Sequence, residues 1–157
     1  MPLFPPSTNA QYRGAPISAW FLLLSGFLEF VPGCIHYFIP ERAIVDIAGL
    51  EVGHSLSLIV GTFTWMGAMQ IPFGLALMIV ALRYRTLVPL FLSFNLMERA
   101  LMSFAGWVWR APADSHHPPE HYASPVSVVL LTLFLVLSMR RSGVEAAPVA
   151  DDTKGAT

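Results

Sequence analysis

The sequence has few charged residues and a single cysteine. Only 12% of its 157 residues are charged, whereas a soluble domain carries about 25%. The net charge of −1 provides no basic surface for nucleic acid. Cys34 excludes an intrachain disulfide and does not indicate a redox compartment. The chain is instead 55% apolar, has a mean hydropathy of +0.60 and is long enough for one domain.

Four long apolar runs predict an all-α, integral membrane protein with four transmembrane helices. A helix needs about 20 apolar residues to cross a bilayer, and the runs approach or exceed that length. The first run lacks a small-residue cleavage site, so we expect it to be retained. The expected helices are about 16–39, 54–82, 87–109 and 122–141, in one domain of residues 16–141, between flexible tails at 1–15 and 142–157.

The distribution of arginine predicts how the chain crosses the membrane. Arginines gather in the N-terminal tail, between the second and third helices, and after the fourth helix, where few acidic residues offset them. By the positive-inside rule this side is cytoplasmic, so both termini lie inside and loops 40–53 and 110–124 lie outside. We therefore expect a protein of a bacterial inner membrane. The residues are Arg13, Arg83, Arg85, Arg140 and Arg141.

Polar side chains lie in the middle of three predicted helices. At 1.5 Å per residue, Glu29, Gln70 and Glu98 all fall roughly 16–20 Å above the inner boundary. A charge at this depth costs at least about 2.5–3.5 kcal/mol, so each residue must face a partner, a cavity or a ligand. Arg99 stays charged and needs a carboxylate from another helix, and Glu29 is the expected partner. Asn95, four residues before Arg99, shares its face of the helix.

The carboxyl groups of this layer allow two interpretations. If Glu29 pairs with Arg99, Glu98 is left protonated or in a second contact, and such a carboxyl is a candidate acid or base. Alternatively, Asn95, Glu98 and Arg99 form a purely structural network. For Glu29, the alternative is a helix kinked by Pro32 in which the carboxyl is neutral or bonded to a neighbour.

A stripe of small residues begins at His54, which opens the second predicted helix. Close helix packing is one explanation of the stripe. The other is a flat, bulky group such as haem, held by the imidazole and lying beside Trp65. The stripe consists of Ser57, Gly61, Thr64 and Ala68, which share one face of the helix.

The remaining histidines have less specific surroundings. His36 follows Glu29 by one heptad, nearer the membrane surface, and we expect an interfacial polar group rather than a ligand. His116, His117 and His121 lie within six residues in the last predicted loop. Such spacing can bind a divalent metal, but no cysteine and few carboxylates complete a site. The sequence therefore favours a solvated loop there.

The end of the first helix and the start of the second share a pattern with a known family. The pattern consists of Glu29, Pro32, Gly33, Ile35, Phe38 and Pro40, then a loop, then His54 and Ser55. It resembles the styrene oxide isomerases, which are small four-helix membrane enzymes. The resemblance covers roughly residues 26–100. Beyond His54 it continues without a gap, and the matching positions are Gly61, Pro72 and Asn95.

This resemblance implies a function and a cofactor. In that family, ferric haem b acts as a Lewis acid on an epoxide oxygen, and a hydride or alkyl shift gives the aldehyde. The resemblance implies a homotrimer with a small apolar substrate, in which His54 is the metal ligand. The cofactor-binding residues would be His54, Ser57, Gly61 and Trp65. The candidate catalytic residues are Asn95, Arg99, Glu98 and Glu29.

The chain departs from the family at two positions. Val60 stands where the family has a second active-site asparagine, and Arg99 where it has a tyrosine. We therefore expect a different epoxide preference, such as a substrate with a polar or anionic group that arginine can hold. Two other functions fit the sequence. One is an oligomeric, proton-linked transporter, and the other is a haem-binding membrane subunit without catalytic activity.

Overall fold

The computed structural model describes residues 3–49, 55–110 and 117–140, and all regular secondary structure in these ranges is helical. The four expected long helices are confirmed to within a few residues. Each is long and apolar enough to cross a membrane, which indicates a membrane protein. They are α1 (Pro16–Phe38), α3 (Leu56–Arg83), α4 (Val88–Phe104) with its π-helical extension η5 (Ala105–Trp109), and α5 (Pro119–Met139).

The short elements lie in the connections. The first part of the predicted loop 40–53 is helical, which the sequence did not indicate. Pro40 begins this helix, where its missing N–H is not needed, and the side chains of Ala43 and Ile44 are buried. The short elements are η1 (Asn9–Gln11), α2 (Pro40–Arg42), the π-helical η2 (Ala43–Ile47) and η4 (Arg85–Leu87).

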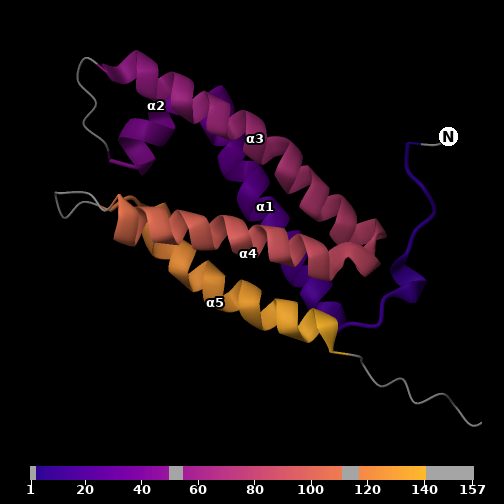
Figure 1. Cartoon of the computed structure of the whole chain (residues 1–157). Helices are drawn as coiled ribbons and strands as arrows, with labels where there is room; N and C mark the ends of the chain where they lie inside the picture. Colours follow the sequence, from indigo (N-terminus) through magenta and orange to yellow (C-terminus); the bar gives the residue numbers. More distant parts are fainter. Residues whose placement is uncertain (1–2, 50–54, 111–116, 141–157) are drawn as a thin grey trace, which may run out of the picture.

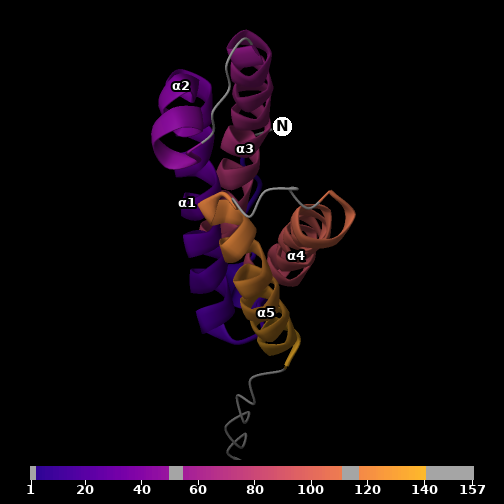
Figure 2. The same ribbon diagram turned by 90° about the vertical axis from the view of Figure 1, so that its left-hand side faces the viewer.

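The long helices form two closely packed pairs. Helix α1 packs along α3, and α4 packs along α5. Helices α3 and α4 meet at η4 and then diverge, so that they form a V in Figure 1. Figure 2 shows the α1–α3 pair beside the α4–α5 pair, with α1 nearer to α5 than α3 is. The two pairs are therefore closest near the η4 turn and separate away from it.

Glycines allow α1 and α3 to approach closely. A Cβ atom at Gly74 would lie 2.7 Å from the backbone nitrogen of Phe30 and 2.8 Å from the carbonyl oxygen of Gly26. A Cβ at Gly67 would lie 2.6 Å from the carbonyl oxygen of Gly33. Small residues at a helix interface let backbones meet and are a common basis of packing in membranes. The α1–α3 pair is therefore fixed by backbone contact.

An apolar core closes the end of the V at η4. Its fully buried members come from all four long helices, and Phe21 of α1 stacks on Phe134 of α5 with ring centroids 4.0 Å apart. Most other large apolar side chains point outward, as expected of helices that face lipid. The core residues are Ala19, Leu22, Leu77, Val80, Ala81, Val88, Leu92 and Leu131.

The N-terminal segment, expected from the sequence to be a flexible tail, is bound to the α3–η4 connection. The Thr8 N–H donates to the Arg83 carbonyl oxygen at 3.0 Å, and Asn9 Nδ2 donates to the Leu82 carbonyl oxygen at 2.7 Å. The Arg83 guanidinium in turn donates to the Pro5 carbonyl oxygen. These contacts satisfy carbonyls that the end of α3 leaves free.

We predict that Gly74→Ala lowers the free energy of unfolding by about 1–3 kcal/mol, because the new methyl group meets backbone atoms that cannot move aside. Gly61→Ala is the matched control, since a Cβ there has nothing within 4 Å. Thermal unfolding of both variants in detergent measures the effect. Equal stability of the two variants would contradict the packing described for α1 and α3.

Candidate functional site

A cavity of about 310 Å³ lies between the two helix pairs and is lined by all four long helices. Its apolar wall comes mainly from α1 and α5, and its polar groups come from every helix. Volumes of this size are at the lower end of those that hold small-molecule ligands. The polar lining residues are Ser25 and His36 of α1, Gln70 of α3, Asn95 and Arg99 of α4, and Glu120 and Ser127 of α5.

The expected ion pair between Glu29 and Arg99 is present and joins α1 to α4. The Glu29 side chain is fully buried, and that of Arg99 is only 16% exposed. Arg99 also approaches the sulfur of Met102, with Nη1 and Sδ 3.8 Å apart. Because the carboxylate compensates the guanidinium charge inside the bundle, Arg99 presents a neutralised group to the cavity.

His36 connects three helices at the cavity wall. Its Nδ1 lies 2.8 Å from Gln70 Oε1. Its Nε2 lies 3.7 Å from Glu120 Oε1. The sequence did not predict these partners: His36 is only 5% exposed and is held between α3 and α5, in the last turn of α1.

Asn95 contributes an unpaired donor to this cavity. The side chain is only 2% exposed, and Nδ2 has no hydrogen-bond partner among the described residues. A buried donor without a partner costs about 1–3 kcal/mol. A ligand with an acceptor oxygen would remove this cost. Asn95 is thus the lining residue whose chemistry points most directly to a bound molecule.

Glu98 is separated from the other expected site residues. Asn95 and Arg99 line the cavity, whereas Glu98 is not among its lining residues. Its Oε2 is buried and has no hydrogen-bond partner in the described part of the chain, as is also true of Ser103 Oγ. This separation follows from the helix period, which turns adjacent residues about 100° apart. Glu98 therefore does not share the cavity with Asn95 and Arg99.

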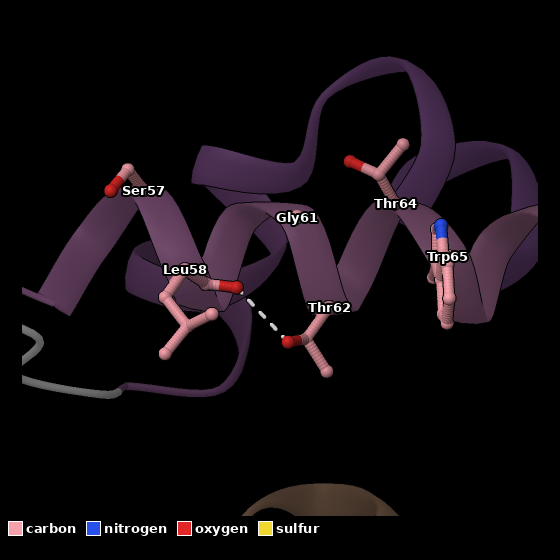
Figure 3. A pocket seen from close by; sticks show the side chains of 6 residues that line it. All are labelled: Ser57, Leu58, Gly61, Thr62, Thr64 and Trp65. Carbon is pink, nitrogen blue, oxygen red and sulfur yellow. Dashed lines mark hydrogen bonds between the residues drawn. The ribbon is translucent and has the colours of Figure 1, made fainter.

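A second hollow, of about 560 Å³, lies on the outer surface of α3 (Figure 3). Its lining residues include three from the predicted cofactor set, Ser57, Gly61 and Trp65. Leu58 and Trp65 in its wall are 74% and 79% exposed. Because Gly61 has nothing near its Cβ position, the small-residue stripe does not pack against another described helix. The packing explanation of the stripe is thus wrong within the described chain.

The two hollows occupy neighbouring turns of the same helix. Leu58 and Thr62 line the outer hollow, and Met66 and Gln70 line the cavity. These residues follow one another at intervals of four and so share one face of α3. Figure 3 shows Leu58 and Thr62 on the same side of the helix, joined by the hydrogen bond from Thr62 Oγ1 to the Leu58 carbonyl oxygen. A ligand in the outer hollow would therefore lie one turn from the cavity.

The expected haem ligand, His54, lies outside the described residues, two positions before α3 begins. His116 lies outside them as well. Within the described ranges, no group of three or more His, Cys, Asp or Glu residues is arranged to hold a metal ion. A haem iron needs only one axial ligand from the protein, so a site of that kind does not require such a group.

Sequence reasoning missed the contacts of His36 with Gln70 and Glu120. The heptad spacing from Glu29 to His36 indicated a shared face, but the partner helices could not be identified from it. Comparisons with protein-family models, with curated proteins and with solved structures find no match for this chain. A function for the chain must therefore be inferred from its residues and from the geometry of the two hollows.

We predict strong coupling between Glu29 and Arg99. Glu29→Leu or Arg99→Met alone should lower the free energy of unfolding by about 3–5 kcal/mol, because each leaves a buried charge without its partner. The double variant should be much less destabilised than the sum of the two. Denaturant titration of the three variants measures the coupling. Additive losses would show that the residues do not interact.

Proposed function

We propose that the protein is a membrane haem enzyme of the epoxide-isomerase type. One observation supports this function best: an open, small-residue surface on α3 adjoins a cavity in which Asn95 Nδ2 has no partner among the described residues. The surface suits a flat cofactor, and the cavity suits a small molecule with an acceptor oxygen. The resemblance of residues 26–100 to the styrene oxide isomerases supports the same function.

The α3 surface fits haem in shape and chemistry. Ser57 and Gly61 have little side chain, so a macrocycle can lie against the helix backbone there. Leu58 and Trp65 are exposed and apolar, as a porphyrin contact requires. His54 precedes Ser57 by three residues and would supply the axial imidazole. Ferric haem, when bound, supplies a Lewis-acidic iron with one open position.

The cavity residues bind and orient the substrate. Asn95 Nδ2 donates a hydrogen bond to the substrate oxygen. The Arg99 guanidinium lines the cavity beside Asn95, but Glu29 compensates its positive charge. We therefore propose a small, neutral epoxide, because Glu29 already compensates the guanidinium and an anionic substituent would meet the carboxylate of Glu120, which lines the cavity. This differs from the anionic preference that the sequence alone suggested.

We also propose an orientation and an assembly. One end of the bundle contains the ends of α3 and α5, the η4 turn and the N-terminal segment. This end carries Arg13, Arg83, Arg85 and Arg140. The positive-inside rule makes this end cytoplasmic, with both termini inside, in a bacterial inner membrane. The exposed α3 surface would be covered by lipid or by a neighbouring copy in the homotrimer that the resemblance implies.

A proton-linked transporter is the second candidate, and one observation favours it. Glu120, His36 and Gln70 are in contact, and Gln70 also lies beside the Glu29 carboxyl. Polar contacts that link several helices in this way are typical of proton relays. Colour distinguishes the two functions, because a transporter purified from haem-replete cells would have no Soret band.

We predict that the purified protein has a Soret band and that His54→Ala abolishes it without preventing membrane insertion. Gly61→Phe should also reduce haem retention, because its ring would occupy the space above the helix backbone. Absorbance per mole of protein and membrane fractionation measure these effects. Full haem content in the His54→Ala protein would remove the ligand assignment.

We predict that the ferric protein converts a neutral epoxide to the matching aldehyde without oxygen or reductant. Dithionite should slow the reaction, because ferrous iron is the weaker Lewis acid. Asn95→Ala should lower kcat about 10²–10³-fold, as expected for the loss of one oriented donor, with the Soret band unchanged. Gas chromatography of the products measures turnover. A haem-loaded ferric protein that converts no epoxide in a broad panel would contradict this activity.

A further inference from the structure

Two histidines, His117 and His121, lie close together at the start of α5, beside η5. The Nδ1 atoms of His117 and His121 are 3.0 Å apart. The residues are four positions apart, and α5 begins between them at Pro119. Both side chains are partly exposed, so ions from solution can reach them. This pair does not line the cavity or the α3 hollow and has no role in the proposed function.

Neighbouring groups hold both rings in place. The His117 ring stacks on Trp107, with centroids 4.3 Å apart and planes 13° from parallel. The His121 ring lies over Gly106, where a Cβ atom would come within 3.2 Å of it. Trp107 Nε1 also donates to the His121 carbonyl oxygen at 2.7 Å. His121 thus belongs to α5 rather than to a loop, whereas His117 lies in the connection before α5, and both rings are partly exposed and pack beside η5.

We propose that His117 and His121 form a two-histidine site for a divalent transition-metal ion. Neutral imidazole nitrogens suit Cu²⁺, Ni²⁺ and Zn²⁺. With metal–nitrogen bonds of about 2.0–2.1 Å, two nitrogens 3.0 Å apart subtend an angle of roughly 90–97° at the metal. This is the angle between adjacent ligands in square-planar or octahedral geometry and is narrower than a tetrahedral angle. The site therefore favours Cu²⁺ or Ni²⁺ over Zn²⁺.

Water completes the coordination in this proposal. The nearest acidic residue in sequence, Glu120, is turned toward His36 of α1, with Nε2 and Oε1 3.7 Å apart. Among the described residues, the ion would thus have two protein ligands, and it would tie α5 to the end of η5 through the packed rings. A shared proton between His117 and His121 is the competing explanation of the short distance, and it predicts no metal binding.

Titration of the purified full-length protein with CuCl₂ and NiCl₂ tests the site. The protein must carry no polyhistidine tag, because a tag binds the same ions. Calorimetry should show one Cu²⁺ site per chain, and His117→Gln and His121→Gln should each weaken it by more than about tenfold, since even outer-shell changes cost 10–100-fold. Cys34→Ser is the control, because it removes another possible metal ligand that is not part of the pair, and it should leave the affinity unchanged.

A second readout does not depend on the histidine variants. Bound Cu²⁺ or Ni²⁺ should quench the fluorescence of Trp107, which stacks directly on His117, and Trp107→Phe should remove that quenching. The Cu²⁺ difference EPR spectrum should show two nitrogen ligands. No binding by the wild-type protein, or binding that both histidine variants retain in full, would overturn the site and leave the shared proton as the explanation.

Discussion

The buried ion pair between Glu29 and Arg99 is the interaction on which the rest of the structure depends. It is the charged contact that joins the α1–α3 pair to α4 across the apolar interior. Because an uncompensated charge at that depth is costly, the two residues must stay at matching heights and in contact. Asn95, one turn before Arg99, lies at the cavity wall on the same side of α4.

The same interaction limits what the cavity can bind. A free arginine would select anions, whereas the charge of Arg99 is compensated by Glu29 and the cavity wall also carries the Glu120 carboxylate. In the proposed function, the unpaired amide of Asn95 would be the group that selects an acceptor oxygen. Since Leu58, Thr62, Met66 and Gln70 follow one face of α3, a cofactor on the outer hollow would lie beside this polar wall. Substrate selection and cofactor binding would thus use adjoining turns of one helix.

The sequence predicted the four long helices and the Glu29–Arg99 pair because both follow from the cost of polar groups in an apolar phase. The sequence did not predict which faces of the helices pack against one another. Helices α1 and α3 pack through Gly26, Gly33, Gly67 and Gly74, and not through the small-residue stripe after His54. Helical periodicity shows that small residues share a face, but it does not show whether another helix packs against that face. Glu120 was missed because it lies in sequence next to a polar loop, and only tertiary packing brings it to His36.

The proposed function requires a haem iron with a histidine on one side only, since a second protein ligand would leave no position for an epoxide oxygen. The EPR spectrum of the ferric protein, recorded as purified and without added ligands, tests this requirement most directly. We expect a high-spin axial signal from five-coordinate or weakly water-bound iron. A low-spin spectrum from iron with two strong protein ligands, or a protein without haem iron, would contradict the proposed function.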